Sequence, residues 1–262
     1  MTAFVVRPVA ASFRYQLRVN LTTLSSILIF LATPIIFGSV SVLFLNSYNS
    51  PELTTRAVLG SGIVAVWTTS LMLSNITLSG ERWSGVVEMF LATPSRLGTM
   101  MLGKLLANAA QGVMAACLSV TVVSLVTVTT ISVEKPLLLG LSAVIATVSV
   151  GALAFAWSPM LFISRNATSV FFVLDTSLVF VSAVFFPLSR LPDWLQPISR
   201  LSPLRWASEA LVTSADANAP ASETFEAWAA LAILGLVYAG IGLAGFGLLE
   251  RRLRRTGELS TF

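Results

Sequence analysis

ERWSGVVEMFLATPSRLG, residues 81–98, is a charged segment that lies between two long apolar runs. Ser84, with Glu88 and Met89 after it, predicts the start of a short helix, and Pro94 predicts its end. A helix of this length is marginal on its own in water. We therefore expect the membrane surface or a partner protein to hold it, and this segment to be the part that touches a soluble partner.

The composition on either side of this segment indicates a membrane protein. Of the 262 residues 55% are hydrophobic and only 11% are charged, and the mean hydropathy is +0.85. One soluble core cannot hide that much apolar surface. The chain is therefore predicted to cross a membrane several times.

The charged and reactive residues exclude or disfavour several functions. The net charge of +4 does not indicate a nucleic-acid partner, because the basic residues stand beside apolar runs and not on one polar face. The chain has no histidine, and its single cysteine, Cys117, lies in an apolar run. A disulfide framework, a metal site of the Cys/His type and catalysis by histidine are therefore not expected, and no catalytic residue is assigned.

Residues 4–20 predict an amphipathic helix that lies along the membrane surface. On a helical wheel the three arginines of this segment lie on one side of the helix. Apolar residues at every fourth position form a separate stripe on another side. A disordered basic tail is the alternative. The arginines are Arg7, Arg14 and Arg18, and the stripe is Val9, Phe13 and Leu17.

Six apolar runs reach the ~20 residues that a helix needs to cross a bilayer. We therefore predict an all-α membrane protein with one domain, residues 1–262, and six transmembrane helices. The runs cover residues 21–45, 57–79, 105–131, 137–163, 167–186 and 227–249.

The basic residues predict the orientation of these helices. With both termini and the loop 81–104 in the cytoplasm, the inside holds most of the 16 basic residues, as the positive-inside rule requires. The cluster 251–255 is a stop-transfer signal on this interpretation, and a polybasic lipid contact is the alternative. The cytoplasmic set is Arg7, Arg14, Arg18, Arg82, Arg96, Lys104, Arg165, Arg251, Arg252, Arg254 and Arg255.

Four polar residues within the predicted spans are candidates for the substrate path or for an interface between helices. Asp175 lies near the middle of the fifth span, where a carboxylate costs ~2.5 to 3.5 kcal/mol. It should therefore face protein or water, and be either protonated or bonded to hydroxyls such as Thr176 or Ser177. Asn75, Asn108 and Gln111 lie toward the cytoplasmic side. Helix packing and substrate contact are both open for these residues.

Two further patterns concern the later part of the chain. Residues 186–211 mix prolines with apolar residues and tryptophans, which forbids one long helix but also argues against disorder. Two short helices that dip back from the outer face fit this pattern, marked by Pro187, Pro192, Trp194 and Pro203. Gly235 with Ala239, and Gly240 with Ala244, have a spacing typical of close helix packing.

Two of these segments resemble the ABC-2 type permeases of ABC transporters. The first is Glu81, Gly85, Glu88 and the run 91–94, followed by residues 103–105; the second is the proline pattern of 186–211. Among these permeases the chain is similar to daunorubicin-resistance and nodulation-type exporters. The resemblance implies a coupling helix in 80–98 that docks on an ATPase, and re-entrant helices on the outer face. The coupling residues are Glu81, Gly85, Val87, Glu88, Phe90, Leu91 and Pro94.

A permease of this family needs an ATP-hydrolysing subunit and a second permease subunit in addition to this chain. It has no phosphate loop, so ATP and Mg belong to a separate ATPase subunit, and a second permease copy or a related permease is implied. Export of an amphipathic drug-like or lipidic molecule across a bacterial inner membrane is expected from the resemblance, with a lipid-linked glycan as the alternative. A secondary transporter and an intramembrane enzyme fit less well, because no inverted repeat and no constellation of nucleophile and base is present.

Overall fold

The computed structural model describes residues 2–46, 51–83, 97–127, 135–164, 166–216 and 218–256, and every regular element in these ranges is a helix. The predicted all-α class is therefore confirmed. The long helices are α1 (Thr2–Thr22), α2 (Leu24–Asn46), α3 (Pro51–Trp83), α5 (Leu97–Thr127), α6 (Pro136–Ile163), α7 (Ala167–Val181) and α10 (Ala221–Thr256). Shorter ones are η1 (Leu188–Arg190), α8 (Gln196–Arg200) and α9 (Pro203–Ala215).

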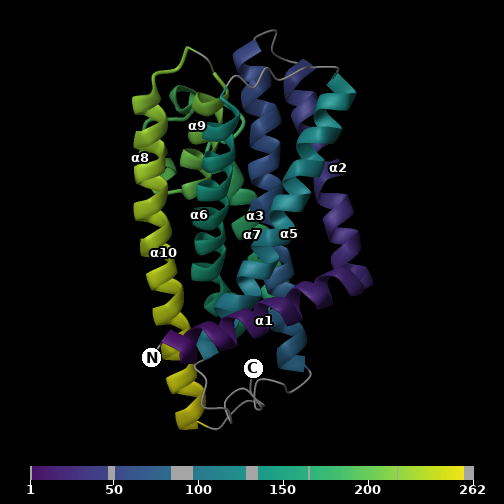
Figure 1. Cartoon of the computed structure of the whole chain (residues 1–262), viewed down its shortest axis with the longest axis vertical. Coiled ribbons are helices and arrows are strands. Elements are labelled where there is room, and N and C mark those ends of the chain that lie inside the picture. The colour runs from purple at the N-terminus through teal and green to yellow at the C-terminus, as the bar shows by residue number, and fades with distance from the viewer. Residues whose placement is uncertain are drawn as a thin grey trace.

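Helix α1 lies across one end of an otherwise roughly parallel bundle (Figure 1). It meets α2 at a bend of 79° at Thr23. The end of α3, the start of α5 and the end of α10 lie at the same end of the bundle, which we call the α1 end. The opposite end holds α8, α9 and the start of α10.

Helix α3 is the centre of the bundle. It packs against α2, α5, α6, α7 and α9, and Trp67 and Leu71 in its middle are fully buried. A buried transmembrane helix needs close contacts with its neighbours, and small residues allow them. At Gly112 of α5 an added Cβ would stand 2.9 Å from the Ser70 hydroxyl and from the Val66 carbonyl oxygen of α3.

Glycines also set the contact between α10 and α6. A Cβ at Gly235 would lie 3.2 Å from the Ser149 hydroxyl, and one at Gly245 would lie 2.9 Å from Pro159. Gly240 has no such neighbour within 4 Å. In the predicted pair Gly235 and Ala239 the glycine therefore packs against α6. In the pair Gly240 and Ala244 the glycine faces open space.

The spans agree with the prediction in part. Among the described residues α3, α5, α6 and α10 are long and apolar enough to cross a membrane, and the bent pair α1 and α2 passes the same test only when taken together. The fifth predicted span, residues 167–186, is a helix of 15 residues that ends at Val181. At 1.5 Å per residue it is ~22 Å long, against ~30 Å for a hydrocarbon core.

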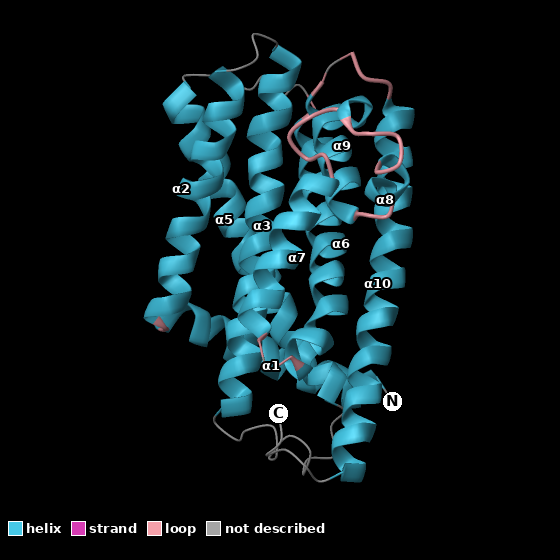
Figure 2. Cartoon of the chain, turned by 180° about the vertical axis from the view of Figure 1, so that it is seen from behind, coloured by secondary structure: helices cyan, strands magenta, loops and turns pink. Residues whose placement is uncertain are grey.

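After α7 the chain folds into short elements at the end opposite α1, which Figure 2 shows from behind. Ala183, at the turn, has a positive φ of 50°. Pro187 precedes η1, and Pro203 begins α9, where its missing N–H costs no hydrogen bond. Helix α9 packs against α6, α10 and α3. The short helices predicted in 186–211 are therefore present, with α9 reaching Ala215.

Candidate functional site

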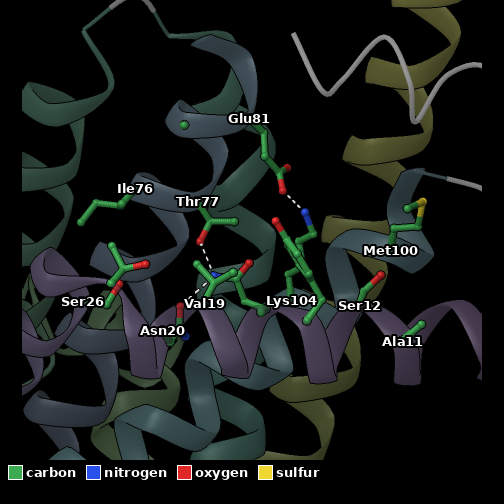
Figure 3. Close-up of a pocket in the computed structure, with 14 residues that line it drawn as sticks. Ala11, Ser12, Val19, Asn20, Ser26, Ile76, Thr77, Glu81, Met100 and Lys104 are labelled. Carbon is green, nitrogen blue, oxygen red and sulfur yellow. Dashed lines mark hydrogen bonds and ion pairs between the residues drawn. The ribbon is translucent and has the colours of Figure 1, made fainter. Parts of the chain in front are cut away.

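A cavity of about 540 Å³ lies at the α1 end, between α1, the start of α2, the end of α3 and the start of α5. Its walls combine an ion pair, side-chain amides and hydroxyls with apolar side chains (Figure 3). The cavity lies where the chain enters and leaves residues 84–96, because α3 ends at Trp83 and α5 begins at Leu97.

Glu81 and Lys104 form an ion pair in the wall of this cavity (Figure 3). The Glu81 side chain is 12% exposed and that of Lys104 only 3%. Lys104 also lies over the ring of Tyr15 in α1, 5.7 Å from its centroid. The pair therefore joins the last turns of α3 to the first turns of α5, so that the two helices flanking 84–96 are fixed to one another and to α1.

A chain of amides and hydroxyls extends from this pair toward the bundle interior. Gln16 Nε2 donates to Asn20 Oδ1 at 2.7 Å and to the Thr77 hydroxyl at 2.9 Å. Asn20 Nδ2 donates to Asn108 Oδ1 at 2.8 Å, and Asn108 Nδ2 donates to the Ser74 hydroxyl at 3.2 Å. Helix α1 is therefore tied to α3 and α5 by polar contacts in addition to packing.

The arginine face and the apolar stripe predicted for α1 do not include the polar residues that make this contact. Arg14 and Arg18 are exposed as expected, and Phe13 and Leu17 are half-buried. The side chains that α1 buries fully are instead polar, namely Ser12, Gln16 and Asn20. Their spacing of four is visible in the sequence as a polar stripe, and this signal could have identified the buried face.

A second contact holds the start of α5. The Leu97 backbone N–H donates to Glu250 Oε2 of α10 at 3.0 Å, so a carboxylate satisfies a free N–H at the helix start. Arg254 Nε in turn donates to Glu250 Oε1 at 3.1 Å. The end of α10 therefore also fixes the point where the chain returns from residues 84–96.

The structure separates the predicted site residues into groups. Glu81 lies on α3, whereas Gly85, Val87, Glu88, Phe90, Leu91 and Pro94 lie outside the described residues. Asn108 belongs to the amide chain, and Asn75 Oδ1 accepts from Ser79 at 3.4 Å. Gln111 is 2% exposed, and its Oε1 has no hydrogen-bond partner among the described residues.

Asp175 lies apart from the cavity, on α7. Its Oδ1 accepts a hydrogen bond of 2.8 Å from the Thr68 hydroxyl of α3, and the residue is 8% exposed. A hydroxyl partner was expected for Asp175, but it is Thr68 and not Thr176 or Ser177, which are both exposed. The contact links α7 to the middle of α3.

The residues of the opposite end form a separate set. Pro203 is buried and Trp194 is 70% exposed, while Pro187 and Pro192 flank η1. Arg56 of α3, which is 7% exposed, donates from Nη1 to Glu209 of α9 at 3.1 Å. This ion pair, which the sequence analysis did not identify, ties α9 to the start of α3.

No group of three or more histidine, cysteine, aspartate or glutamate residues that could hold a metal ion occurs in the part of the chain that the structure describes.

A search of curated proteins finds no match for the chain. The sequence profile of a family described as ABC-2 type transporter matches residues 9–215, which is more than half of the 262 residues and includes most of α1, the Glu81–Lys104 pair and α9. The chain belongs to the ABC-2 type transporter family.

Proposed function

We propose that the chain is the membrane-spanning permease subunit of an ATP-driven exporter, and that residues 80–98 dock on a separate ATPase subunit. The observation that carries this proposal is the bracing of the two helices around 84–96. Glu81 and Lys104 join α3 to α5, and Glu250 holds the start of α5. A push on the segment between these helices is therefore passed to both of them together.

The docking surface on this proposal is the short capped helix predicted from Ser84 to Pro94. Val87, Phe90 and Leu91 supply the buried anchor, and Glu88 sets the register by its charge at the rim. Glu81 is not one of these rim charges, because its carboxylate pairs with Lys104 inside the protein. It positions the segment and does not touch the ATPase.

The proposed arrangement in the membrane has six spans, formed by α2, α3, α5, α6, α7 and α10. Helix α1 lies in the inner interface with both termini in the cytoplasm of a bacterial cell, and α8 and α9 lie at the outer end. The bend of 79° between α1 and α2 supports this arrangement, since it turns α1 across the bundle. The short α7 reaches the outer side through the segment that follows it.

The transported molecule is proposed to be amphipathic, drug-like or lipidic, and to move outward. The exposed apolar faces of the spans and the resemblance to drug-resistance and nodulation-type exporters support this class. A lipid-linked glycan is the second candidate, and a secondary transporter is a weaker one. A second permease copy or a related permease completes the path, with Asp175, Asn75, Asn108 and Gln111 near it, and the ATPase carries ATP and Mg.

The test uses two variants in the proposed docking segment and two matched controls at the other end of the bundle. Glu88→Lys and Phe90→Ala should each weaken copurification of the ATPase and substrate-stimulated ATP hydrolysis about tenfold, as expected for losing an interface anchor. Glu223→Lys and Phe225→Ala make the same changes at exposed positions of α10. They should leave ATPase copurification and substrate-stimulated ATP hydrolysis unchanged.

The amount of permease in the membrane, measured by blotting, should be equal for all four variants. If Glu88→Lys and Phe90→Ala retain full ATPase association and full transport, residues 80–98 are not the coupling segment. A helix that only lies on the inner leaflet would give that result, because Glu88→Lys would improve its attraction to anionic lipid.

A further inference from the structure

The cavity at the α1 end is too large to be a packing defect, and polar side chains form part of its wall. Its volume of about 540 Å³ corresponds to many water molecules, at ~30 Å³ each. Apolar side chains form much of the wall, with a few polar groups converging from four helices, as in sites for small molecules. The hydroxyl of Ser26 and the amide of Gln16 belong to residues that are only 3% exposed, so the polar wall is held in place by the fold.

The charges in the wall restrict what this cavity can hold. Glu81 and Lys104 both line it and balance one another. A ligand with a net charge would bring an uncompensated charge against a neutral wall, which is costly in a buried site. A ligand with one positive and one negative group avoids this cost, because its negative group can lie beside Lys104 and its positive group beside Glu81.

The surroundings of the cavity indicate the kind of molecule that reaches it. Thr23, at the bend between α1 and α2, lines the cavity, and Leu21, Leu24 and Leu28 around the same bend are 54%, 70% and 56% exposed. Tyr15, which is 63% exposed, forms another part of the wall. An aromatic ring and exposed leucines beside a polar cavity are typical of a membrane interface, where lipid headgroups lie.

We propose that this cavity binds the zwitterionic headgroup of a lipid, of the phosphoethanolamine kind, with its phosphate at Lys104 and its ammonium at Glu81. The primary ammonium donates hydrogen bonds to the Glu81 carboxylate. The phosphate oxygens accept from the hydroxyls of the wall, on the side of Lys104, whose positive charge attracts them although its Nζ is itself covered by the protein. A choline headgroup has no N–H to donate and an anionic glycerol headgroup has no positive charge, so both fit less well.

The test places the purified full-length permease in nanodiscs of equal parts phosphatidylethanolamine, phosphatidylcholine and phosphatidylglycerol. Native mass spectrometry then counts the lipids that stay bound on release. Phosphatidylethanolamine should be enriched roughly five- to tenfold over the other two, the effect of one or two hydrogen bonds to a charged group. Glu81→Gln should remove the preference for phosphatidylethanolamine over phosphatidylcholine. Lys104→Gln should weaken the binding of both zwitterionic lipids.

A second pair of variants does not depend on the ion pair. Ala11 is exposed and lines the cavity, whereas its neighbour Ala10 is exposed but does not. Ala11→Trp fills the cavity and should abolish the enrichment, while Ala10→Trp adds the same side chain on the same helix and should retain it. No enrichment in the wild-type protein, or equal enrichment in Ala11→Trp and Ala10→Trp, would show that the cavity holds water only and would overturn the proposal.

The lipid can be a resident of the membrane or the transported molecule itself. A further measurement, on the permease assembled with its ATPase, distinguishes these sources. A resident lipid stays bound during ATP turnover, and a transported lipid is depleted, while either result supports the headgroup site. Because binding to the permease alone needs no ATPase, this proposal stands or fails separately from the docking of residues 80–98.

Discussion

Lys104 lies on a helix long and apolar enough to cross a membrane, with only 3% of its side chain exposed, and Glu81 is the partner that makes this possible. Taking either charge out of water costs several kcal/mol, which the attraction within a close pair offsets. Removing one partner leaves the other charge buried without compensation. Exchanging the two charges should therefore destabilise the protein less than removing or reversing one of them.

The first prediction at the residue scale is a charge exchange. Glu81→Lys and Lys104→Glu should each destabilise the permease by about 3 kcal/mol or more, lowering its melting temperature in detergent and uncoupling ATP hydrolysis from transport. The double variant, with the charges exchanged, should recover most of both. If the double variant is as poor as the worse single variant, the two residues do not act as a pair.

The sequence identified several residues of this network but few of their partners. Asn108 and Asp175 stood out because an amide or a carboxylate is rare in an apolar run. Asn20 lies 88 residues before Asn108, and Thr68 lies 107 residues before Asp175. Hydroxyls and amides of this kind are common at helix surfaces, so only the packing of the helices decides which of them meet.

At the scale of elements, the approach of α1 to α5 depends on Gly103. A methyl group at Gly103 would overlap the Val9 carbonyl oxygen and would touch Ser12. Backbone atoms cannot move aside as the end of a flexible side chain can. The absence of a side chain at Gly103 therefore allows α1 to lie close enough for Gln16 and Asn20 to reach α3 and α5.

The prediction is that Gly103→Ala destabilises the protein and loosens α1. Displacing the helix should cost roughly 1 to 3 kcal/mol, seen as a lower melting temperature and as easier proteolysis within α1. The control is Gly240→Ala, where a Cβ meets nothing within 4 Å. There alanine should be neutral or stabilising by up to ~1 kcal/mol, because it is the better helix former. Equal effects of both variants would contradict the close contact.

The elements themselves were largely predictable, and their ends were not. Apolar runs of about 25 residues identified α2, α3, α5, α6 and α10, because length and hydropathy suffice for this. The run 167–186 continues past Val181, where the helix ends at a turn held by Ser182 and Ser208. Hydropathy does not mark such an end, because the turn is as buried and apolar as the helix.

At the scale of the whole molecule, α3 connects the two ends of the bundle. It carries Glu81 at the α1 end, Thr68 in the middle and Arg56 at the opposite end, and these bond to α5, α7 and α9. A displacement of α3 along its axis would therefore disturb all three contacts. This arrangement gives the proposed coupling segment a rigid route to the short helices at the other end.

The last prediction concerns which end of the bundle faces the cytoplasm. With the native Cys117 replaced by serine, single cysteines are placed at Asp193, in the exposed turn before α8, and at Arg251, on the exposed end of α10. The excess of basic residues at the α1 end predicts that this end is inside. The Asp193→Cys variant should therefore react with a membrane-impermeant maleimide in intact cells, and the Arg251→Cys variant only after permeabilisation, with the Cys117→Ser variant as the unlabelled control. Labelling of the Arg251→Cys variant in intact cells would invert the arrangement and remove residues 80–98 from reach of any cytoplasmic ATPase.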